Sequence, residues 1–222
     1  MAPQQNVGTM AWNICDCSQS SLQAAKRNKL PAFHRLANVQ ATVRAVASES
    51  ASPAWLCDRV NSVLRANLAP EKFVTLFYGV LDGEEKTVQY TSAGHPPPIL
   101  KRASGSVQLL ENGGAVLGVF PPWKCENSLV QLAPGDRLLL FTDGITEASK
   151  ADGEQLGEER LIHLPASSPG SLLPHSNRRL LDSVKSFGDS HLQDAVTLLA
   201  IAADAANQAT TQENKSSSPA AF

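Results

Sequence analysis

Two aspartates at the ends of apolar runs are the residues of this sequence best suited to chemistry. Asp143 closes the run Arg137-Leu-Leu-Leu-Phe-Thr-Asp143-Gly144, and Asp194 opens the run Asp194-Ala-Val-Thr-Leu-Leu-Ala-Ile201. Carboxylates are preferred ligands of Mg²⁺ and Mn²⁺, and a strand end holds such a ligand rigidly. If the two strands are antiparallel neighbours, the carboxylates converge at one sheet edge, where a cation would offset their repulsion. The alternative for each residue is a local Asx-turn or a strand cap.

A third segment of chemical interest is Ser92-Ala-Gly-His95-Pro-Pro-Pro98. Three consecutive prolines exclude a helix or a central strand, so this segment is predicted to be a loop. A histidine held in such a loop can act as a general acid or base. The alternative is a structural histidine whose ring is hydrogen-bonded to the backbone.

The composition excludes several classes of protein. Lys and Arg number 19 against 21 Asp and Glu, so the net charge of −2 argues against a nucleic-acid or anionic-membrane binder. The four cysteines are too scattered for a disulfide framework, and the Cys15-x-Cys17 pair lacks a second pair to complete a zinc site. No run approaches the ~18 apolar residues of a membrane span. The N-terminus lacks the features of a secretory signal, so the predicted location is cytoplasmic.

The spacing of apolar residues predicts an α+β fold. Residues 1–29 show no sustained period and are predicted to be irregular, whereas a helical stripe begins near Leu30. Ser52-Pro53 predicts the N-cap and first position of a second helix. Asp82-Gly83 predicts the turn of a β-hairpin. Further elements are predicted as strands at 73–81, 87–91, 99–100, 107–110, 129–132, 137–141 and 195–202, a helix at 172–187, and a disordered tail at 204–222.

Several motifs occur together in an order found in one family. The sequence resembles the SpoIIE/RsbU-like branch of the PPM-type (PP2C-like) metal-dependent serine/threonine protein phosphatases. The resemblance covers a phosphatase domain at about residues 30–203. It is carried by LANVQATVRAVA (36–47), FVTLFYGVLD (73–82), YTSAGHPPPIL (90–100), GGAVLGVF (113–120), LAPGDRLLLFTDGITEA (132–148) and LQDAVTLLAI (192–201).

This resemblance implies both a fold and an activity. The fold is an α-β-β-α sandwich of two antiparallel sheets flanked by helices, with a site for two Mn²⁺ or Mg²⁺ ions at one edge. The metals activate a water that attacks the phosphorus of phosphoserine or phosphothreonine. By the same resemblance, Asp143 and Asp194 are catalytic metal ligands. The implied partner is a phosphorylated protein, typically an anti-sigma-factor antagonist, in sigma-factor regulation or related signalling.

The sequence departs from the family just before the first long helix. There the family has a Gly-Asp pair followed by a Ser-Gly-His/Lys-Gly loop, and its Asp bridges both metals. Aligning Leu30-Pro31-Ala32 with the helix start puts Ala24 in the bridging position, as if the N-terminus were truncated and the first strands were missing or irregular. In a second register, Ile14-Cys-Asp16-Cys-Ser18 echoes the motif and makes Asp16 a metal ligand.

Three hypotheses follow from this departure. The chain is an active phosphatase that uses Asp143 and Asp194 with Asp16, or a pseudophosphatase that binds a phosphoprotein without hydrolysing it. The third hypothesis is a family fragment that does not fold stably, because a missing first strand leaves a sheet edge unpaired.

Overall fold

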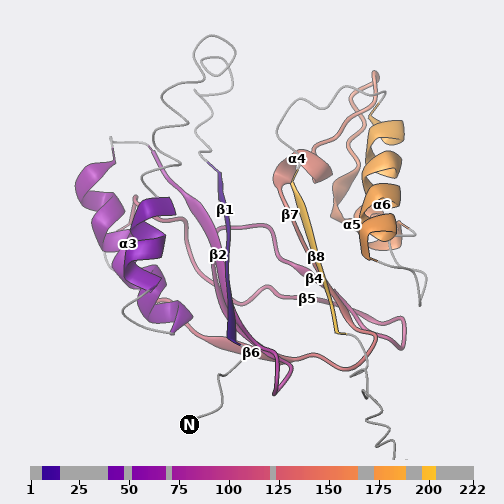
Figure 1. Cartoon of the computed structure of the whole chain (residues 1–222). Coiled ribbons are helices and arrows are strands. Elements are labelled where there is room, and N and C mark those ends of the chain that lie inside the picture. The colour runs from indigo at the N-terminus through magenta and orange to yellow at the C-terminus, as the bar shows by residue number, and fades with distance from the viewer. Residues whose placement is uncertain are drawn as a thin grey trace, which may run out of the picture.

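The structure is a computed structural model, and it describes residues 7–15, 40–47, 52–68, 72–120, 124–164, 173–188 and 197–203. Two four-stranded antiparallel sheets lie face to face, with helices on both outer faces (Figure 1). The predicted α-β-β-α sandwich is therefore confirmed. The predictions for Leu30, for Ala24 and for the tail from 204 concern residues outside the described ranges. The predicted division of the chain into segments stays a prediction.

The first sheet has the strand order β1-β2-β3-β6. The prediction that residues 1–29 are irregular is wrong for β1, which pairs with β2 from Val7 opposite Asp82 to Cys15 opposite Thr75. A strand in this position is stabilised by pairing with a segment far along the chain, which a local pattern does not contain. The predicted hairpin around Asp82-Gly83 is confirmed by the pairing of β2 with β3. The strands are β1 (Val7–Cys15), β2 (Thr75–Asp82), β3 (Thr87–Ala93) and β6 (Ser128–Gln131).

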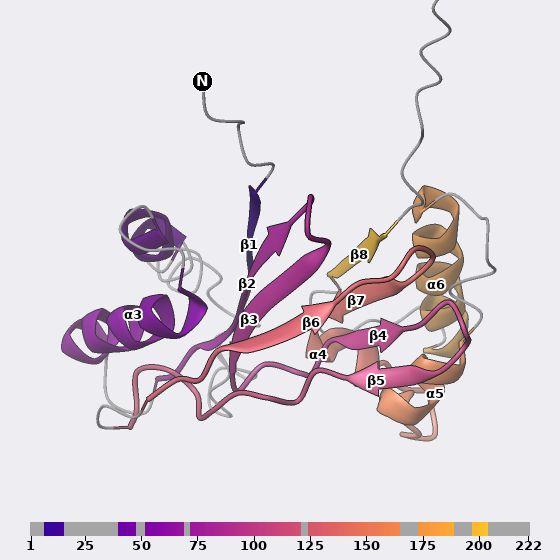
Figure 2. The ribbon, with the colours of Figure 1, turned by 90° about the horizontal axis from the view of Figure 1, so that it is seen from below.

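The second sheet has the strand order β5-β4-β7-β8. The end of β7 lies beside the start of β8, with Phe141 opposite Leu198, as the two-strand hypothesis for the aspartates requires. The chain passes between the two sheets several times, because β3 and β6 lie in the first sheet whereas β4 and β7 lie in the second (Figure 2). The strands are β4 (Ile99–Lys101), β5 (Val107–Leu109), β7 (Arg137–Phe141) and β8 (Leu198–Ala202).

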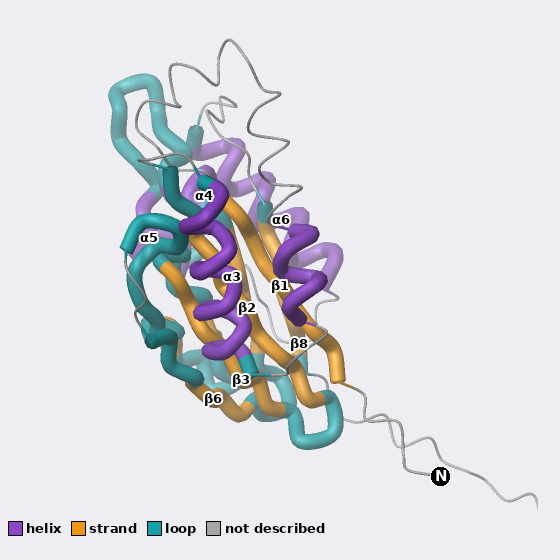
Figure 3. The backbone as a smooth tube through the Cα atoms, turned by 90° about the vertical axis from the view of Figure 1, so that its left-hand side faces the viewer, coloured by secondary structure: helices purple, strands orange, loops and turns teal. Residues whose placement is uncertain are grey.

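Helices cover the outer face of each sheet. Residues 40–47 are helical and lie with α3 against the first sheet (Figure 3), and Val43 and Val46 are buried as the helical stripe predicts. The second sheet is covered by helices of which only α6 was predicted. Within the described ranges, no helix is both long enough and apolar enough to cross a membrane. The helices are α3 (Pro53–Asn67), α4 (Asp143–Thr146), α5 (Gly157–His163) and α6 (Leu173–Phe187).

The start of α3 follows the predicted capping pattern. Ser52 is the N-cap, and its side-chain oxygen accepts a hydrogen bond from the Trp55 N–H over 3.4 Å. Pro53 occupies the first helical position. A backbone N–H at this position has no partner within the helix, so its absence in proline costs no hydrogen bond.

Buried side chains form three layers of core. In β2, Leu76 and Tyr78 pack in the cluster under α3, whereas Phe77 packs in the cluster between the two sheets. Both faces of β2 are therefore buried, which explains its unbroken apolar run. A third cluster lies between the second sheet and its helices, and includes Phe141, Leu180 and Val184. Burying a side chain such as Leu or Phe contributes about 1.5–3 kcal/mol, so all three layers stabilise the sandwich.

Candidate active site

In the first sheet, β1 and β3 both finish at the same end of the sheet, where β2 begins. Cys15, the last residue of β1, is opposite Thr75 at the start of β2. Ala93, the last residue of β3, is opposite Leu76, also at the start of β2. The chain that follows Ala93 therefore leaves the first sheet at the end where β1 also ends, with β2 between the two strands.

The second sheet presents the end of β7 and the start of β8 at the same end of the sandwich. Residues 94–98 connect β3 to β4, whose first residue Ile99 lies opposite Leu139 near the end of β7. Phe141 and Leu198 pair at that same end. Figure 1 shows the end of β1, the short helix α4 and the start of β8 together at the upper end of the molecule. The topology thus gathers segments from both sheets into one place.

Asp143 lies at this end, as the first residue of α4, two residues after the last residue of β7. Its side chain is half-buried, and its Oδ1 accepts a hydrogen bond from the Gly144 N–H over 2.9 Å. An Asx-turn, the alternative considered, would instead bond the N–H two residues on, so this contact is only a bond to the next residue. It does not compete with metal binding, because a carboxylate has two oxygens with about four lone-pair sites.

The other two predicted ligands, Asp16 and Asp194, lie outside the described residues. Asp16 directly follows Cys15, the last residue of β1, in the sequence. Asp194 precedes Thr197, whose backbone is hydrogen-bonded to Thr142 next to Asp143. The structure thus describes Cys15, which is next to Asp16 in the sequence, and Thr197, which is three residues after Asp194. Both lie at the Asp143 end of the sandwich.

His95 lies in the loop that joins the two sheets at this end. Its side chain is only 7% exposed, and its Nδ1 is 2.8 Å from the Pro96 carbonyl oxygen. The backbone hydrogen bond considered as an alternative is therefore confirmed. Burial lowers the pKa of the imidazole, while the Pro96 carbonyl and the Asp143 carboxylate act to raise it. His95 thus lies within the electrostatic field of Asp143.

Close backbone contacts fix the histidine loop. Gly94 has a φ of +66°, and its N–H donates to the Gly114 carbonyl oxygen over 2.9 Å. The Gly114 N–H in turn donates to the Ser92 carbonyl oxygen over 2.8 Å. A Cβ added at Gly113 would lie 2.5 Å from that same oxygen, so only glycine allows this approach. The glycine-rich segment of the predicted family motif thus holds the histidine loop in position.

Asp136, at the start of β7, is a buried acid that the sequence analysis did not single out. Its carboxylate accepts hydrogen bonds from the N–H groups of Ala103 and Ala133, each over 2.9 Å, and from Arg102 over 2.8 Å. Burial raises the pKa of this carboxyl, but the three hydrogen bonds and the Arg102 charge outweigh burial and hold the pKa below its ordinary value. Asp136 therefore fixes the opposite end of the strand that leads to Asp143.

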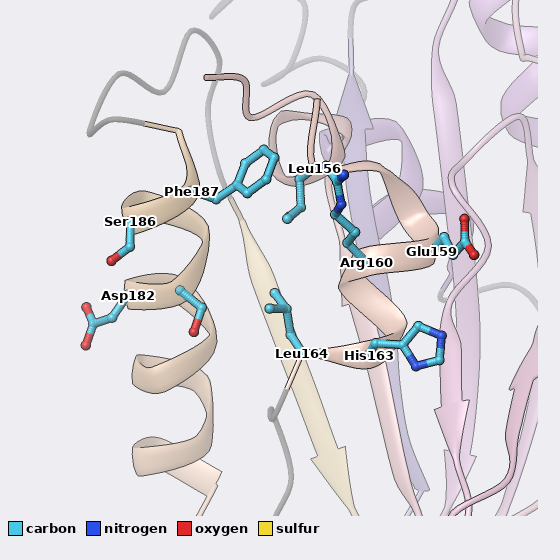
Figure 4. Close-up of a pocket in the computed structure, with 9 residues that line it drawn as sticks. Leu156, Glu159, Arg160, His163, Leu164, Asp182, Ser186 and Phe187 are labelled. Atoms are coloured by element: carbon cyan, nitrogen blue, oxygen red, sulfur yellow. The ribbon is translucent and has the colours of Figure 1, made fainter. Parts of the chain in front are cut away.

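A surface groove of about 860 Å³ lies between α5 and α6 (Figure 4). The side chains of Arg160 and Phe187 approach each other across it, with the guanidinium 5.3 Å from the ring centroid. The groove contains neither Asp143 nor His95, so it is separate from the candidate active site. It is lined by Leu156, Glu159, Arg160, His163, Leu164, Asp182, Ser183, Ser186 and Phe187.

Comparison with protein families decides the classification of the chain. The family model described as Stage II sporulation protein E (SpoIIE) matches residues 29–204. The chain belongs to the SpoIIE family. The resemblance expected from the motifs is confirmed.

Curated relatives of this SpoIIE-family chain include proteins of Bacillus subtilis and Synechocystis. Phosphoserine phosphatase RsbU of Bacillus subtilis is 27% identical over 154 residues, which cover 67% of this chain and 44% of RsbU. Protein IcfG of Synechocystis is 27% identical over 134 residues, which cover 58% of this chain and 20% of IcfG. The chain therefore spans less than half of the length of these relatives.

Solved structures confirm the PP2C fold. The SiaA-PP2C domain of Pseudomonas aeruginosa superposes with a TM-score of 0.68 at 16% identity, covering 90% of this chain and 81% of that domain. RsbX, solved in complex with magnesium, superposes with a TM-score of 0.57 at 17% identity, covering 87% of this chain and 85% of RsbX. The shared fold therefore extends over most of the chain.

Proposed function

We propose that this SpoIIE-family domain hydrolyses phosphoserine or phosphothreonine in a protein substrate, at a divalent-metal site formed by Asp16, Asp143 and Asp194. The observation that carries the proposal is the convergence of three strand ends. Asp143, a predicted ligand, lies at one end of the sandwich together with Cys15 and Thr197. In the sequence, Cys15 is next to Asp16 and Thr197 is close to Asp194. RsbU, with 27% identity, is named a phosphoserine phosphatase.

The end of β1 favours the second of the two registers considered for the bridging ligand. In the first register Ala24 occupies the ligand position, and its methyl side chain has no atom that binds a metal. In the second register Asp16 directly follows the last residue of β1, and Asp143 comes two residues after the last residue of β7. Both carboxylates then come from strand ends at the same end of the sandwich. This parallel supports Asp16 as the third ligand.

The proposed ligand set suits a hard divalent cation. Three carboxylates match the oxygen preference of Mg²⁺ and Mn²⁺, and RsbX with the same fold was solved with magnesium. Among the residues that the structure describes, no three His, Cys, Asp or Glu side chains are grouped for metal binding. In the proposal, Asp16 and Asp194 complete the site with Asp143. When bound, the metals would lower the pKa of a water and neutralise charge on the departing serine or threonine oxygen.

Hydrogen bonds within the chain hold Asp143 and the start of β8 in place. The Gly144 N–H fixes one oxygen of Asp143, and the hydrogen bonds between Thr142 and Thr197 hold the start of β8 alongside. The sandwich therefore holds Asp143 and the strand ends that lie nearest to Asp16 and Asp194 in the sequence. A ligand set held in this way loses little entropy when a cation binds. The proposed substrate is a phosphorylated regulatory protein of the anti-sigma-factor-antagonist type.

Calorimetric titration with Mn²⁺, together with phosphate release from a phosphoserine peptide, tests this proposal. We expect Asp16→Asn, Asp143→Asn and Asp194→Asn each to weaken Mn²⁺ binding by more than about tenfold and to abolish turnover, because each removes a ligand. The matched control is Asp182→Asn on the exposed face of α6, which should change neither. Circular dichroism confirms that each variant is folded.

Two outcomes would contradict the proposal in different ways. Mn²⁺ binding that survives all three substitutions would show that these carboxylates are not the ligands. A folded wild-type chain that neither binds Mn²⁺ nor releases phosphate would favour the pseudophosphatase, a module that binds a phosphoprotein without hydrolysing it.

A further inference from the structure

We infer that His95 is a positioning residue of the proposed site, and that its Nε2 atom accepts a hydrogen bond from a water molecule held at the Asp143 end of the sandwich. This inference rests on the proposed function and names a residue that the predicted ligand set does not include. It follows from the tautomer, the burial and the position of the imidazole ring.

The contact with Pro96 determines which ring nitrogen carries the proton. A carbonyl oxygen only accepts hydrogen bonds, so the 2.8 Å contact requires a proton on His95 Nδ1. In the neutral ring, Nε2 is then a bare acceptor. Burial of the ring favours this neutral form.

The Nε2 acceptor is buried but has no hydrogen-bond partner in the described part of the chain. Buried polar atoms are nearly always satisfied, so an unsatisfied one commonly marks the place of a bound water or ligand. An acceptor at this position suits a water proton. It does not suit a phosphate oxygen, which would also be an acceptor.

A second unsatisfied polar atom lies on the face of the first sheet that packs against the second sheet. Thr75 Oγ1 is buried without a hydrogen-bond partner in the described residues, at the point where β2 lies opposite Cys15. Side chains alternate along a strand, so Thr75 shares the inter-sheet face of β2 with Phe77. The Phe77 ring lies 6.4 Å from the His95 ring, centroid to centroid. A buried water needs two to four polar partners, and this end of the sandwich offers the hydroxyl, the imidazole and Asp143.

The loop holds the ring without help from a ligand. Gly94 packs against Val116 so closely that an added Cβ would lie 2.5 Å from Val116 Cγ1. Three prolines follow His95 and restrict the backbone on the other side. A side chain fixed in this way keeps its acceptor in one place, as the positioning of a reacting water requires.

Two substitutions separate this role from a purely structural one. His95→Asn keeps an N–H donor near the position of Nδ1 and removes Nε2. His95→Gln removes the Nδ1 donor and places an amide oxygen near the position of Nε2. The matched control is His163→Asn, because His163 is exposed on α5 and lies in the separate groove.

We expect His95→Asn to remain folded and to lower kcat for a phosphoserine peptide by about 10–100-fold with little change in KM, as expected for loss of an outer-shell positioning group. His95→Gln should recover part of that loss despite lower thermal stability, and His163→Asn should behave as wild type. A folded His95→Asn variant with wild-type kcat would overturn the inference.

A second measurement does not depend on turnover. In the ¹⁵N-labelled wild-type chain, His95 is expected to show a protonated Nδ1 and a bare Nε2, and its Nε2 resonance should shift when Mg²⁺ is added. The same resonance of His163 should not move, and the shift should be absent in Asp143→Asn. An Nε2 resonance unchanged by Mg²⁺ overturns the inference, even where His95→Asn fails to fold.

The two proposals fail in recognisably different ways. If the wild-type chain binds Mg²⁺ and turns over but His95→Asn does so equally well, only the role of His95 is wrong. If the wild-type chain neither binds the metal nor turns over, the proposed function is wrong and the role of His95 falls with it.

Discussion

Thr142 and Thr197 are joined by two hydrogen bonds where β7 ends and β8 begins. The Thr142 N–H donates to the Thr197 carbonyl oxygen over 3.2 Å, and Thr142 Oγ1 accepts from the Thr197 N–H over 3.0 Å. Asp143 follows Thr142 directly, and Asp194 lies shortly before Thr197 in the sequence. The pair therefore couples the two strand ends that carry these predicted ligands.

Removing the Thr142 hydroxyl should loosen this coupling without changing the shape of the core. Thr142 is only 6% exposed, so Thr142→Val leaves the Thr197 N–H without its acceptor and should cost about 1–2 kcal/mol of stability. We expect Mn²⁺ binding to weaken by about tenfold, as for other outer-shell changes. Thr142→Ser keeps the oxygen and should bind Mn²⁺ nearly as wild type. Equal Mn²⁺ affinities for the Val and Ser variants by calorimetry would refute the coupling.

Gly94 and Gly105 offer a matched test of the histidine loop. Both have positive φ, +66° and +90°, but an added Cβ meets Val116 Cγ1 at 2.5 Å only at Gly94 and meets nothing within 4 Å at Gly105. The strained backbone should cost each Ala variant roughly 1 kcal/mol. Gly94→Ala should lose about 1–3 kcal/mol more from overpacking. Urea unfolding measures both, and equal losses would show that Val116 moves aside freely.

Asp136→Asn should show a stability loss that depends on pH. The Asp136 carboxyl is 1% exposed and ion-paired with Arg102, which is itself part-exposed at 29%, so the loss at neutral pH should be about 2–4 kcal/mol. The lowered pKa of Asp136 stabilises the fold above the unfolded value of about 3.9 and ceases to do so as the pH falls through the folded value. The gap between wild type and Asp136→Asn should therefore be full at about pH 7 and should narrow below about pH 4. Thermal unfolding across this range measures the gap, and a gap that stays constant would exclude the ionised carboxylate as its cause.

Asn61 should matter more than its neighbour on the same helix, Asn67. The Asn61 side-chain oxygen is buried and accepts a hydrogen bond from the Gly118 N–H over 2.8 Å, tying α3 to the glycine-rich segment. Asn61→Ala should therefore cost about 1–3 kcal/mol, because it leaves that N–H unsatisfied. Asn67 is exposed, so Asn67→Ala should change stability by less than about 0.5 kcal/mol in the same chemical unfolding experiment. Similar losses for the two variants would contradict this account.

Local signals were sufficient for many of the elements. The N-cap at Ser52, the turn at Asp82-Gly83 and the strand that ends before Asp143 all follow from short runs of sequence. Such features depend on capping, turn chemistry and periodicity, which involve residues close together in the chain. The polar stretch around α5 gave no such signal, because Leu161 is the one fully buried residue of that helix.

The sequence by itself determined the family, the presence of Asp143 at a strand end and most of the strand positions. Only the tertiary structure showed that Val7–Cys15 pair with β2, that β6 and β7 belong to different sheets, and that Cys15, His95 and Thr197 share one end of the sandwich with Asp143. Local pattern cannot supply these facts, because sheet membership and register are fixed by side chains that pack across the fold from distant parts of the chain. The candidate site is made from strand ends, so it exists only once those long-range pairings have formed.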